Sequence, residues 1–259
     1  MKRRILIKIG GRAFEGESGF RELATAIAAS PGIDVIVVHG GGAEISAALK
    51  AAHRATEFID GIRITPAEDI RIVEQVLSET VNARIAGWLT NHGVSCRRLS
   101  GKTDGMLVAA PLTRGGRDYG FVGQIKQVAP TAIETALKES RVPVISPISA
   151  DETGASYNVN ADSAAAALAA AAGCTELAFF TDVAGVMVSG EPVARMTIEQ
   201  AAEWIAAGEI KGGMVAKIES AVQALEKGVD RIYIGMWYGS KTLDGIAAGR
   251  RSLGTWLCR

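Results

Sequence analysis

The chain is poor in cysteine and has no excess of charge of either sign. Its three cysteines, Cys96, Cys174 and Cys258, lie far apart and are odd in number, which excludes a disulfide framework and the spacing of a zinc site. The 28 basic and 28 acidic residues cancel, so no long-range field would gather nucleic acid or an anionic membrane. These absences favour small-molecule chemistry in a reducing compartment.

Long apolar runs and targeting signals are also missing. The alanine-rich stretch Ser163–Ala172 is too short to cross a bilayer. Lys2, Arg3 and Arg4 precede strand-like residues, without the apolar stretch and cleavage site of a secretory signal. We therefore expect a cytoplasmic protein with neither a membrane nor a nucleic acid as partner.

Two common nucleotide motifs are absent as well. No Gly-x-x-x-x-Gly-Lys-Ser/Thr sequence occurs, which excludes a Walker-type phosphate loop. The segment Gly40–Ile45 supplies the first two glycines of a dinucleotide fingerprint, but Ile45 stands where a third small residue is needed. NAD binding is thus disfavoured.

What the sequence does contain is an alternation of apolar runs and helical periodicity over nearly its whole length. This alternation predicts an α/β fold, with a mainly parallel sheet between helix layers. We expect a single domain over residues 1–259, with an N-terminal lobe over about 1–170 and a C-terminal lobe over about 171–259. The predicted strands are Arg4–Ile9, Asp34–His39, Ser95–Leu99, Val142–Ile145, Leu177–Thr181 and Arg231–Ile234.

Two further elements stand out. The longest helical pattern runs from about Pro66 to Asn91, with proline in its first turn. It could form a dimer interface or pack within one subunit. The stretch Gly105–Ile125 has short alternating runs around Gly115-Gly116, as expected for a β-hairpin that could fold over a site.

Glycine-rich turns follow the first two predicted strands. The first strand ends in Lys8-Ile9-Gly10-Gly11, and the second ends in His39-Gly40-Gly41-Gly42. Each alone could be an ordinary strand-to-helix corner. Their recurrence, with a lysine beside the first, indicates phosphate binding, because glycines at strand ends let N–H groups converge on an anion.

Three later segments add polar groups at inferred strand ends or helix starts. Lys211-Gly212-Gly213-Met214 opens a helix with Lys217 one turn inside, Asn158–Asp162 precedes another helix, and Thr181–Val186 follows a strand. Read singly, they could be a solvated turn, a helix cap and a plain loop. Together with the glycine turns they supply what phosphoryl transfer requires, which is mostly positioning and electrostatic stabilisation.

In order and spacing, these segments resemble the amino acid kinase family nearly from end to end. The resemblance rests on Lys8–Gly11, His39–Gly42, Gly61–Thr65, Ser100–Gly105, Asn158–Asp162, Thr181–Val186, Gly212–Met214 with Lys217, and Gly254-Thr255. It implies an N-terminal lobe that binds an acyl-amino acid and a C-terminal lobe that binds ATP with Mg²⁺.

The resemblance also implies roles for individual residues. Lys8 and Lys217 would stabilise the transferring phosphoryl group and Asp162 would orient both lysines. Gly41, Gly42, Arg63 and Asn158 would bind the substrate, with N–H groups of Gly10, Gly11 and Gly41 on phosphate oxygens. The nucleotide would contact Gly10, Gly11, Thr181, Asp182, Val183, Ala184, Gly185, Val186, Glu209, Ile210 and Lys211. No side chain is predicted to bind a metal, since Mg²⁺ would be held mainly by phosphates and water.

The activity that the resemblance implies is ATP-dependent phosphorylation of the side-chain carboxylate of N-acetyl-L-glutamate, in arginine biosynthesis. Ala43-Glu44 after the glycine turn departs from this pattern and is similar to kinases of carrier-protein-linked aminoadipate or glutamate, which are the alternative. A carboxylate at Glu44 would repel an anionic substrate if it pointed inward; we expect it to point outward. Arg12 is another unusual neighbour of the phosphate turn.

A catalytically inactive sensor of amino acids or nucleotides is a further alternative. The retention of Lys8, Asp162 and Lys217 argues against it. Arginine-inhibited members of the family carry a helix before the first strand, whereas here the strand begins almost at once. We therefore expect a homodimer without arginine feedback.

Overall fold

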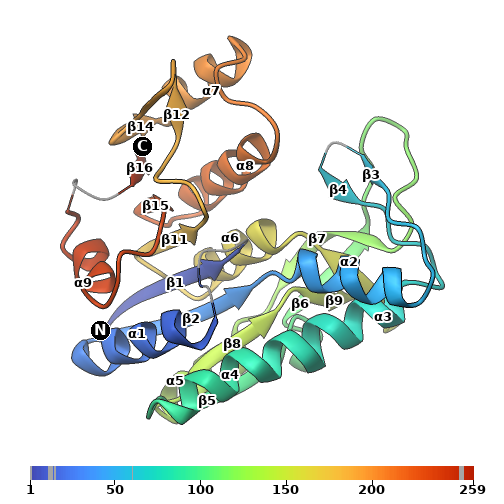
Figure 1. Ribbon diagram of the computed structural model, residues 1–259, viewed down its shortest axis with the longest axis horizontal. Coiled ribbons are helices and arrows are strands. Elements are labelled where there is room, and N and C mark those ends of the chain that lie inside the picture. Colours follow the sequence, from blue (N-terminus) through green and yellow to red (C-terminus); the bar gives the residue numbers. More distant parts are fainter. Residues whose placement is uncertain (1, 11–13, 15, 60, 251–253) are drawn as a thin grey trace.

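An eight-stranded, mostly parallel sheet forms the centre of the molecule (Figure 1). The computed structural model describes residues 2–10, 14, 16–59, 61–250 and 254–259. The strand order is β14-β16-β15-β11-β1-β2-β8-β5, in which β15 and β16 are antiparallel. The strands are β1 (Arg3–Ile9), β2 (Ile33–His39), β5 (Cys96–Ser100), β8 (Val142–Ser146), β11 (Glu176–Phe180), β14 (Arg195–Thr197), β15 (Arg231–Gly235) and β16 (Thr255–Cys258). All six predicted strands are confirmed, with ends shifted by a residue at most.

Helices cover both faces of this sheet and create two hydrophobic cores. Along β1, Leu6 enters one core while Ile5 and Ile7 enter the other, because side chains alternate across a strand. One core holds residues of α5 (Thr131–Lys138), α6 (Ala161–Ala171), α7 (Ile198–Ala206) and α8 (Gly213–Glu226). The other holds residues of α1 (Gly16–Ala29), α2 (Gly42–Ala51), α3 (Ile70–Glu74), α4 (Asn82–Asn91) and α9 (Lys241–Ala247). The predicted fold class is confirmed.

The predicted hairpin forms part of a small closed barrel. The strands β6 (Leu107–Pro111) and β7 (Val122–Val128) pair antiparallel, and they close with β9 (Ile148–Ala150) and β10 (Ser156–Val159). In Figure 1 the barrel lies at the right, beneath the ribbon of β3 (Phe58–Ile59) and β4 (Ile62–Arg63), while β12 (Met187–Val188), α7 and α8 lie at the upper left. A second ribbon pairs β12 with β13 (Glu191–Pro192), and a 3-10 turn, η2, spans Thr103–Gly105.

The long helix starts later than the sequence predicted and is not α-helical throughout. It begins at Ile70, and Pro66 lies before it in a turn closed by the Asp69 N–H on the Pro66 carbonyl. The reason is that Thr65 is held extended by hydrogen bonds with Tyr119 and Phe121. Between α3 and α4, Gln75–Val81 forms a π-helix, η1. Its Leu77 and Val81 reach the glycine turn after β2.

Among the described residues, no helix has both the length and the apolar character that a membrane span requires.

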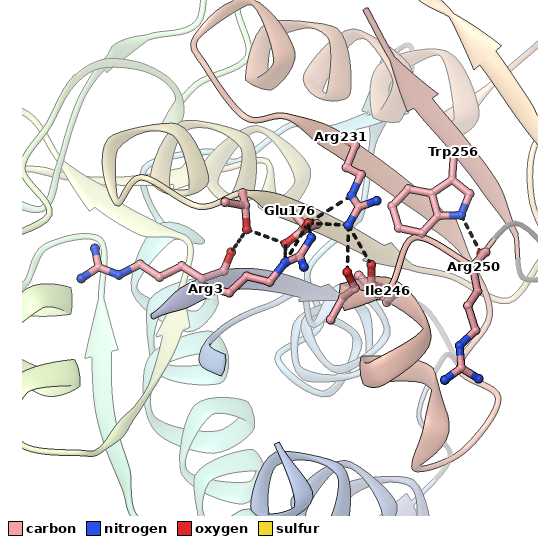
Figure 2. A network of polar contacts seen from close by, with 9 residues as sticks. Arg3, Glu176, Arg231, Ile246, Arg250 and Trp256 are labelled. Atoms are coloured by element: carbon pink, nitrogen blue, oxygen red, sulfur yellow. Dashed lines mark hydrogen bonds and ion pairs between the residues drawn. The ribbon is translucent and has the colours of Figure 1, made fainter. Parts of the chain in front are cut away.

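The amino end of β11 carries a buried ion cluster (Figure 2). Glu176 is buried and accepts hydrogen bonds from Arg3 and Arg231. Burial opposes its ionisation, but the arginines and Thr175 outweigh burial and lower the pKa of Glu176.

This cluster joins distant parts of the chain at the edge opposite the glycine turns. Arg231 also donates to the Ala247 carbonyl at the end of α9, at 2.9 Å, and its guanidinium lies over the Trp256 ring of β16. Glu176 therefore links β1 to β15, and Arg231 of β15 connects both to α9 and β16. Because this cluster lies at the amino end of β11, the carboxyl ends of the strands are available for the site.

Candidate active site

The carboxyl ends of β1, β2 and β11 lie near the end of the barrel strand β10, and the predicted catalytic and substrate-binding residues gather there. Two cavities, of about 540 and about 620 Å³, share the glycine turn Gly40–Gly42 as a common wall. The first is lined by Arg63 and Asn158, and the second by Gly10 and Asp182. The turn therefore separates the predicted substrate side from the predicted phosphate side.

Lys8, Asp162 and Lys217 form one buried ion cluster. The Asp162 carboxylate lies 2.8 Å from the Lys8 ammonium through Oδ1 and 2.8 Å from the Lys217 ammonium through Oδ2. The three side chains are between 9 and 13% exposed, so solvent screens the pairs little. The structure brings the three predicted catalytic residues together from β1, α6 and α8.

The charges in this cluster influence each other's ionisation. Burial opposes the charge on Asp162, but Lys8 and Lys217 outweigh it and hold the pKa of Asp162 below its usual value. Burial lowers the pKa of Lys217, and the nearby Lys8 lowers it further, while Asp162 counters both. One carboxylate against two ammonium groups leaves the cluster with a net positive charge, which suits a phosphoryl group.

Local sequence explains how the cluster is placed. Asn160 caps α6, and its side-chain oxygen accepts from the N–H groups of Asp162 and Ser163 at 2.9 and 3.1 Å. Asp162 is thereby free of capping and can bind the lysines. Gly212, with φ of 58°, precedes α8 and places Lys217 one turn inside that helix.

Gly10 contributes space rather than a free donor. A Cβ at this position would lie 2.1 Å from the Lys8 ammonium nitrogen, so only glycine lets that side chain curl over the turn. The Gly10 N–H donates to the Phe180 carbonyl at 3.3 Å. This differs from the prediction that the Gly10 N–H faces phosphate, because parallel pairing of β1 with β11 continues one residue past the strand. Gly11 and Arg12 lie outside the described residues.

Arg63 and Asn158 face the first cavity. Arg63 is buried, and its Nη2 donates to the Gly42 carbonyl at 2.8 Å and to Ser46 Oγ at 2.9 Å. Among the described residues, Arg63 Nη1 has no hydrogen-bond partner although it is buried. A buried N–H that lacks a partner costs free energy until a ligand binds it. Asn158 lies on β10 and donates to Thr65 Oγ1.

Glu44 does not line the Arg63 cavity, but it does not point wholly outward either. It lies in the first turn of α2, it lines the second cavity, and its carboxylate pairs with Arg84 of α4. The Glu44 carboxylate is therefore not placed to repel an anionic substrate bound at Arg63.

The predicted nucleotide segments divide into exposed and buried residues. Val183 is exposed, whereas Val186 and Ile210 lie in the core, so only their backbone could reach a ligand. The Val186 N–H donates to Thr255 Oγ1, and Glu209 accepts from the Ser189 N–H. Of the residues predicted for this role that the structure describes, Gly10 and Asp182 line the second cavity. Lys211 is exposed.

Sequence reasoning missed three contributors near Arg63 and the glycine turn. Ser46 holds the Arg63 guanidinium, Phe58 lies beneath it with its ring centroid 4.7 Å away, and Leu77 packs against Gly41. Ser46 stands one helical turn after Gly42, which is a spacing the sequence offers; Phe58 and Leu77 offer no comparable signal. Within the described part of the chain, no group of three or more His, Cys, Asp or Glu is placed to hold a metal ion.

The fold and the lysine-flanked glycine turns define a phosphoryl-transferring α/β protein, and comparison with known proteins identifies its family. The model of the amino acid kinase family matches residues 3–235. The chain is 37% identical to the acetylglutamate kinase of Geobacillus stearothermophilus, over 93% of this chain and 96% of that enzyme. It is 42% identical to that of Chloroflexus aggregans, over 77% and 79%.

A solved structure agrees. The crystal structure of smu.665 from Streptococcus mutans UA159 is 28% identical, covers 100% of this chain and 99% of that one, and superposes with a TM-score of 0.81. The chain belongs to the amino acid kinase family, and it is a kinase.

We predict that Asp162→Asn lowers the free energy of unfolding at pH 7 by about 3–5 kcal/mol, because it leaves two buried ammonium groups without their counter-charge. The pKa of Asp162 is depressed in the folded state. The stabilisation is therefore fully present above the unfolded value of 3.8 and is lost as pH falls through the folded value. Denaturant unfolding from pH 7 to pH 3 should show the difference between the two proteins shrinking below about pH 4.

Asp34 offers a matched control, since its carboxylate is 19% exposed and also has two basic neighbours, Lys2 and Arg4, but at 3.8 and 3.7 Å. Asp34→Asn should cost about 1 kcal/mol or less. Equal losses for the two variants would contradict the role given to Asp162.

Proposed function

We propose that this protein transfers the γ-phosphoryl group of ATP to the side-chain carboxylate of N-acetyl-L-glutamate. The observation that carries the proposal is the arrangement around the glycine turn. Arg63, with its unpartnered Nη1, lines the first cavity. The Lys8–Asp162–Lys217 cluster lies next to both cavities, because Ala161 and Ala216 line the first and Gly10 lines the second. The acetylglutamate kinases that match nearly the whole chain support the same substrate.

The substrate carries two carboxylates that need different treatment. Arg63 would bind the α-carboxylate through Nη1, since a guanidinium presents several fixed N–H groups and Nη2 is already engaged by Gly42 and Ser46. Asn158, on β10, would form a hydrogen bond with the acetylamino group of the substrate. The side-chain carboxylate would then extend past Gly41 and Gly42 toward the phosphate side.

The reaction needs positioning and charge rather than a base. A carboxylate oxygen attacks the γ-phosphorus in line, and the bond to the β,γ-bridging oxygen breaks. ADP leaves with the electron pair, and the product is an acyl phosphate. The carboxylate is already ionised at neutral pH, so no proton is removed. Lys8 and Lys217 stabilise the charge on the transferring group, and N–H groups of the Gly40–Gly42 turn supplement them.

ATP would approach from the second cavity and the loops after β11. We propose that Asp182 and the exposed residues of Thr181–Val186 and Glu209–Lys211 contact it. The lobe of about 1–170 would bind the acyl-amino acid, and the lobe of about 171–259 would bind ATP. Mg²⁺ would enter the site bound to the phosphates. That ion supplies neutralisation of phosphate charge. A homodimer and a cytoplasmic location stay predictions.

The carrier-linked kinase is the less favoured alternative. Glu44 was the residue that raised it, and Glu44 pairs with Arg84 outside the Arg63 cavity. The relatives that match over most of the chain are named acetylglutamate kinase.

The activity is tested by Mg-ATP-dependent ADP release, with hydroxylamine to trap acyl phosphate, on N-acetylglutamate, glutamate, aspartate and aminoadipate. We expect hydroxamate with N-acetylglutamate alone, because only this substrate presents both the carboxylate for Arg63 and an uncharged acylated nitrogen. Silence with every free amino acid, despite demonstrable ATP binding, would refute the proposed substrate and favour the carrier-linked kinase.

Arg63→Lys should raise the KM for N-acetylglutamate by about 10- to 100-fold, since the variant keeps the charge but loses the planar fork. The KM for ATP should stay within about twofold, because Arg63 lines the first cavity and not the second. Arg54→Lys is the matched control, as Arg54 pairs with Glu68 and Asp69 and lines neither cavity. An equal rise in both KM values would show that Arg63 is not a substrate residue.

A further inference from the structure

The glycine turn after β2 has all three of its carbonyl groups engaged by donors from the protein. The Gly40 carbonyl bonds His39 Nδ1 at 2.8 Å, the Gly41 carbonyl accepts from the Ile45 N–H at 2.9 Å, and the Gly42 carbonyl accepts from Arg63. Among the described residues, the N–H groups of Gly41 and Gly42 have no such partner. The turn therefore has a polarity, with carbonyl oxygens held by the protein and N–H groups left for an anion.

His39 sets the direction of one of those N–H groups. A carbonyl oxygen can only accept, so the Nδ1 of His39 carries a proton and donates to Gly40. In a trans peptide the C=O and the following N–H point in opposite directions. Holding the Gly40 carbonyl against the imidazole thus turns the Gly41 N–H away from the core and toward the site.

Asn82 fixes which nitrogen of His39 carries that proton. Its Nδ2 lies 3.1 Å from His39 Nε2, and it also contacts the Val144 carbonyl at 2.8 Å and the Leu99 carbonyl at 3.3 Å. An amide nitrogen cannot accept, so the contact with His39 requires Nε2 to be the acceptor, which agrees with Nδ1 as the donor. The orientation of the amide is itself fixed, because Asn82 Oδ1 accepts from Arg98 Nε at 3.1 Å.

The pair is buried and uncharged. His39 and Asn82 are each 1% exposed. Burial lowers the pKa of His39 to about 4, so the ring remains neutral over the range in which kinases work. Asn82 begins α4 directly after the π-helix η1, whose Leu77 and Val81 pack on Gly41. The π-helix therefore packs directly against the glycine turn.

We propose that Asn82 and His39 form a positioning pair that aims the Gly41 N–H at the transferring phosphoryl group. The effect of this pair on catalysis rests on the proposed function, whereas its hydrogen-bond geometry does not. Asn82 lines neither cavity, and His39 lines only the second one, beside the Gly40 carbonyl that it holds. Neither side chain is assigned a contact with the reacting atoms. Their contribution is the orientation of one backbone donor where negative charge develops.

Two variants of His39 separate this role from mere packing. The side-chain amide nitrogen of Asn occupies about the position of imidazole Nδ1, whereas that of Gln reaches about as far as Nε2. His39→Asn should keep a donor to the Gly40 carbonyl and retain kcat within about threefold. His39→Gln should lose that donor and lower kcat by about 10- to 100-fold, with both KM values within about threefold. Equal losses in both variants, or a change confined to KM, would overturn the proposal.

The tautomer is measured independently of activity in the wild-type protein. Nitrogen-15 spectra of the imidazoles are simple, because the chain has three histidines, His39, His53 and His92, and the His39 signals are assigned by their loss in the variants. We expect a protonated Nδ1 and an unprotonated Nε2 at pH 7. A protonated Nε2 would refute the pair even where kcat follows expectation. Wild-type protein that shows the expected tautomer but no turnover of N-acetylglutamate would refute the proposed function and leave the pair standing.

Discussion

The buried triangle of Lys8, Asp162 and Lys217 is the interaction on which the site depends. Two ammonium groups could not share a dry pocket without a counter-charge, and a lone carboxylate there would take up a proton. The single carboxylate at 2.8 Å from each lysine makes the cluster stable while leaving it net positive. Because the three residues come from β1, α6 and α8, the cluster also requires the two helices and the sheet to lie in one arrangement.

A second constraint acts on the backbone rather than on side chains. The Gly40–Gly42 turn is held through its carbonyl groups by a histidine ring, a helix N–H and an arginine. Arg63 acts on both the turn and the substrate. Its Nη2 holds the Gly42 carbonyl, and its unpartnered Nη1 is available to bind a carboxylate. The proposed substrate contact and the position of the Gly42 carbonyl therefore depend on the same guanidinium, which is 8% exposed.

Much of this could be predicted from the sequence, for identifiable reasons. Apolar runs ending in glycine mark the carboxyl ends of parallel strands, and these ends coincide in any such sheet. Local pattern therefore predicts that Gly10 and the Gly40–Gly42 turn line one cavity. The segment Asn158–Asp162 has more polar side chains than a helix cap needs. Asn160 alone caps α6, and Asp162 is available to pair with the lysines.

The remainder depended on tertiary contacts that local pattern does not contain. Pro66 has the features of a helix start, but the bonds of Thr65 to the barrel delay the helix to Ile70. The Gly10 N–H is consumed by strand pairing with β11. Asn82 sits in a helical stripe of apolar residues, and its importance appears only when His39, Arg98 and Val144 are placed around it.

The measurement that tests the central claim most directly compares kcat with ATP affinity in Lys217→Ala. If the lysine acts on the charge of the transferring group, kcat for hydroxamate formation falls by about 100-fold or more while the calorimetric Kd for ATP changes by less than about fivefold. Lys50→Ala, at the exposed end of α2, should change neither quantity. A Lys217→Ala enzyme with kcat close to wild type, or one whose entire loss is explained by weaker ATP binding, would contradict the account.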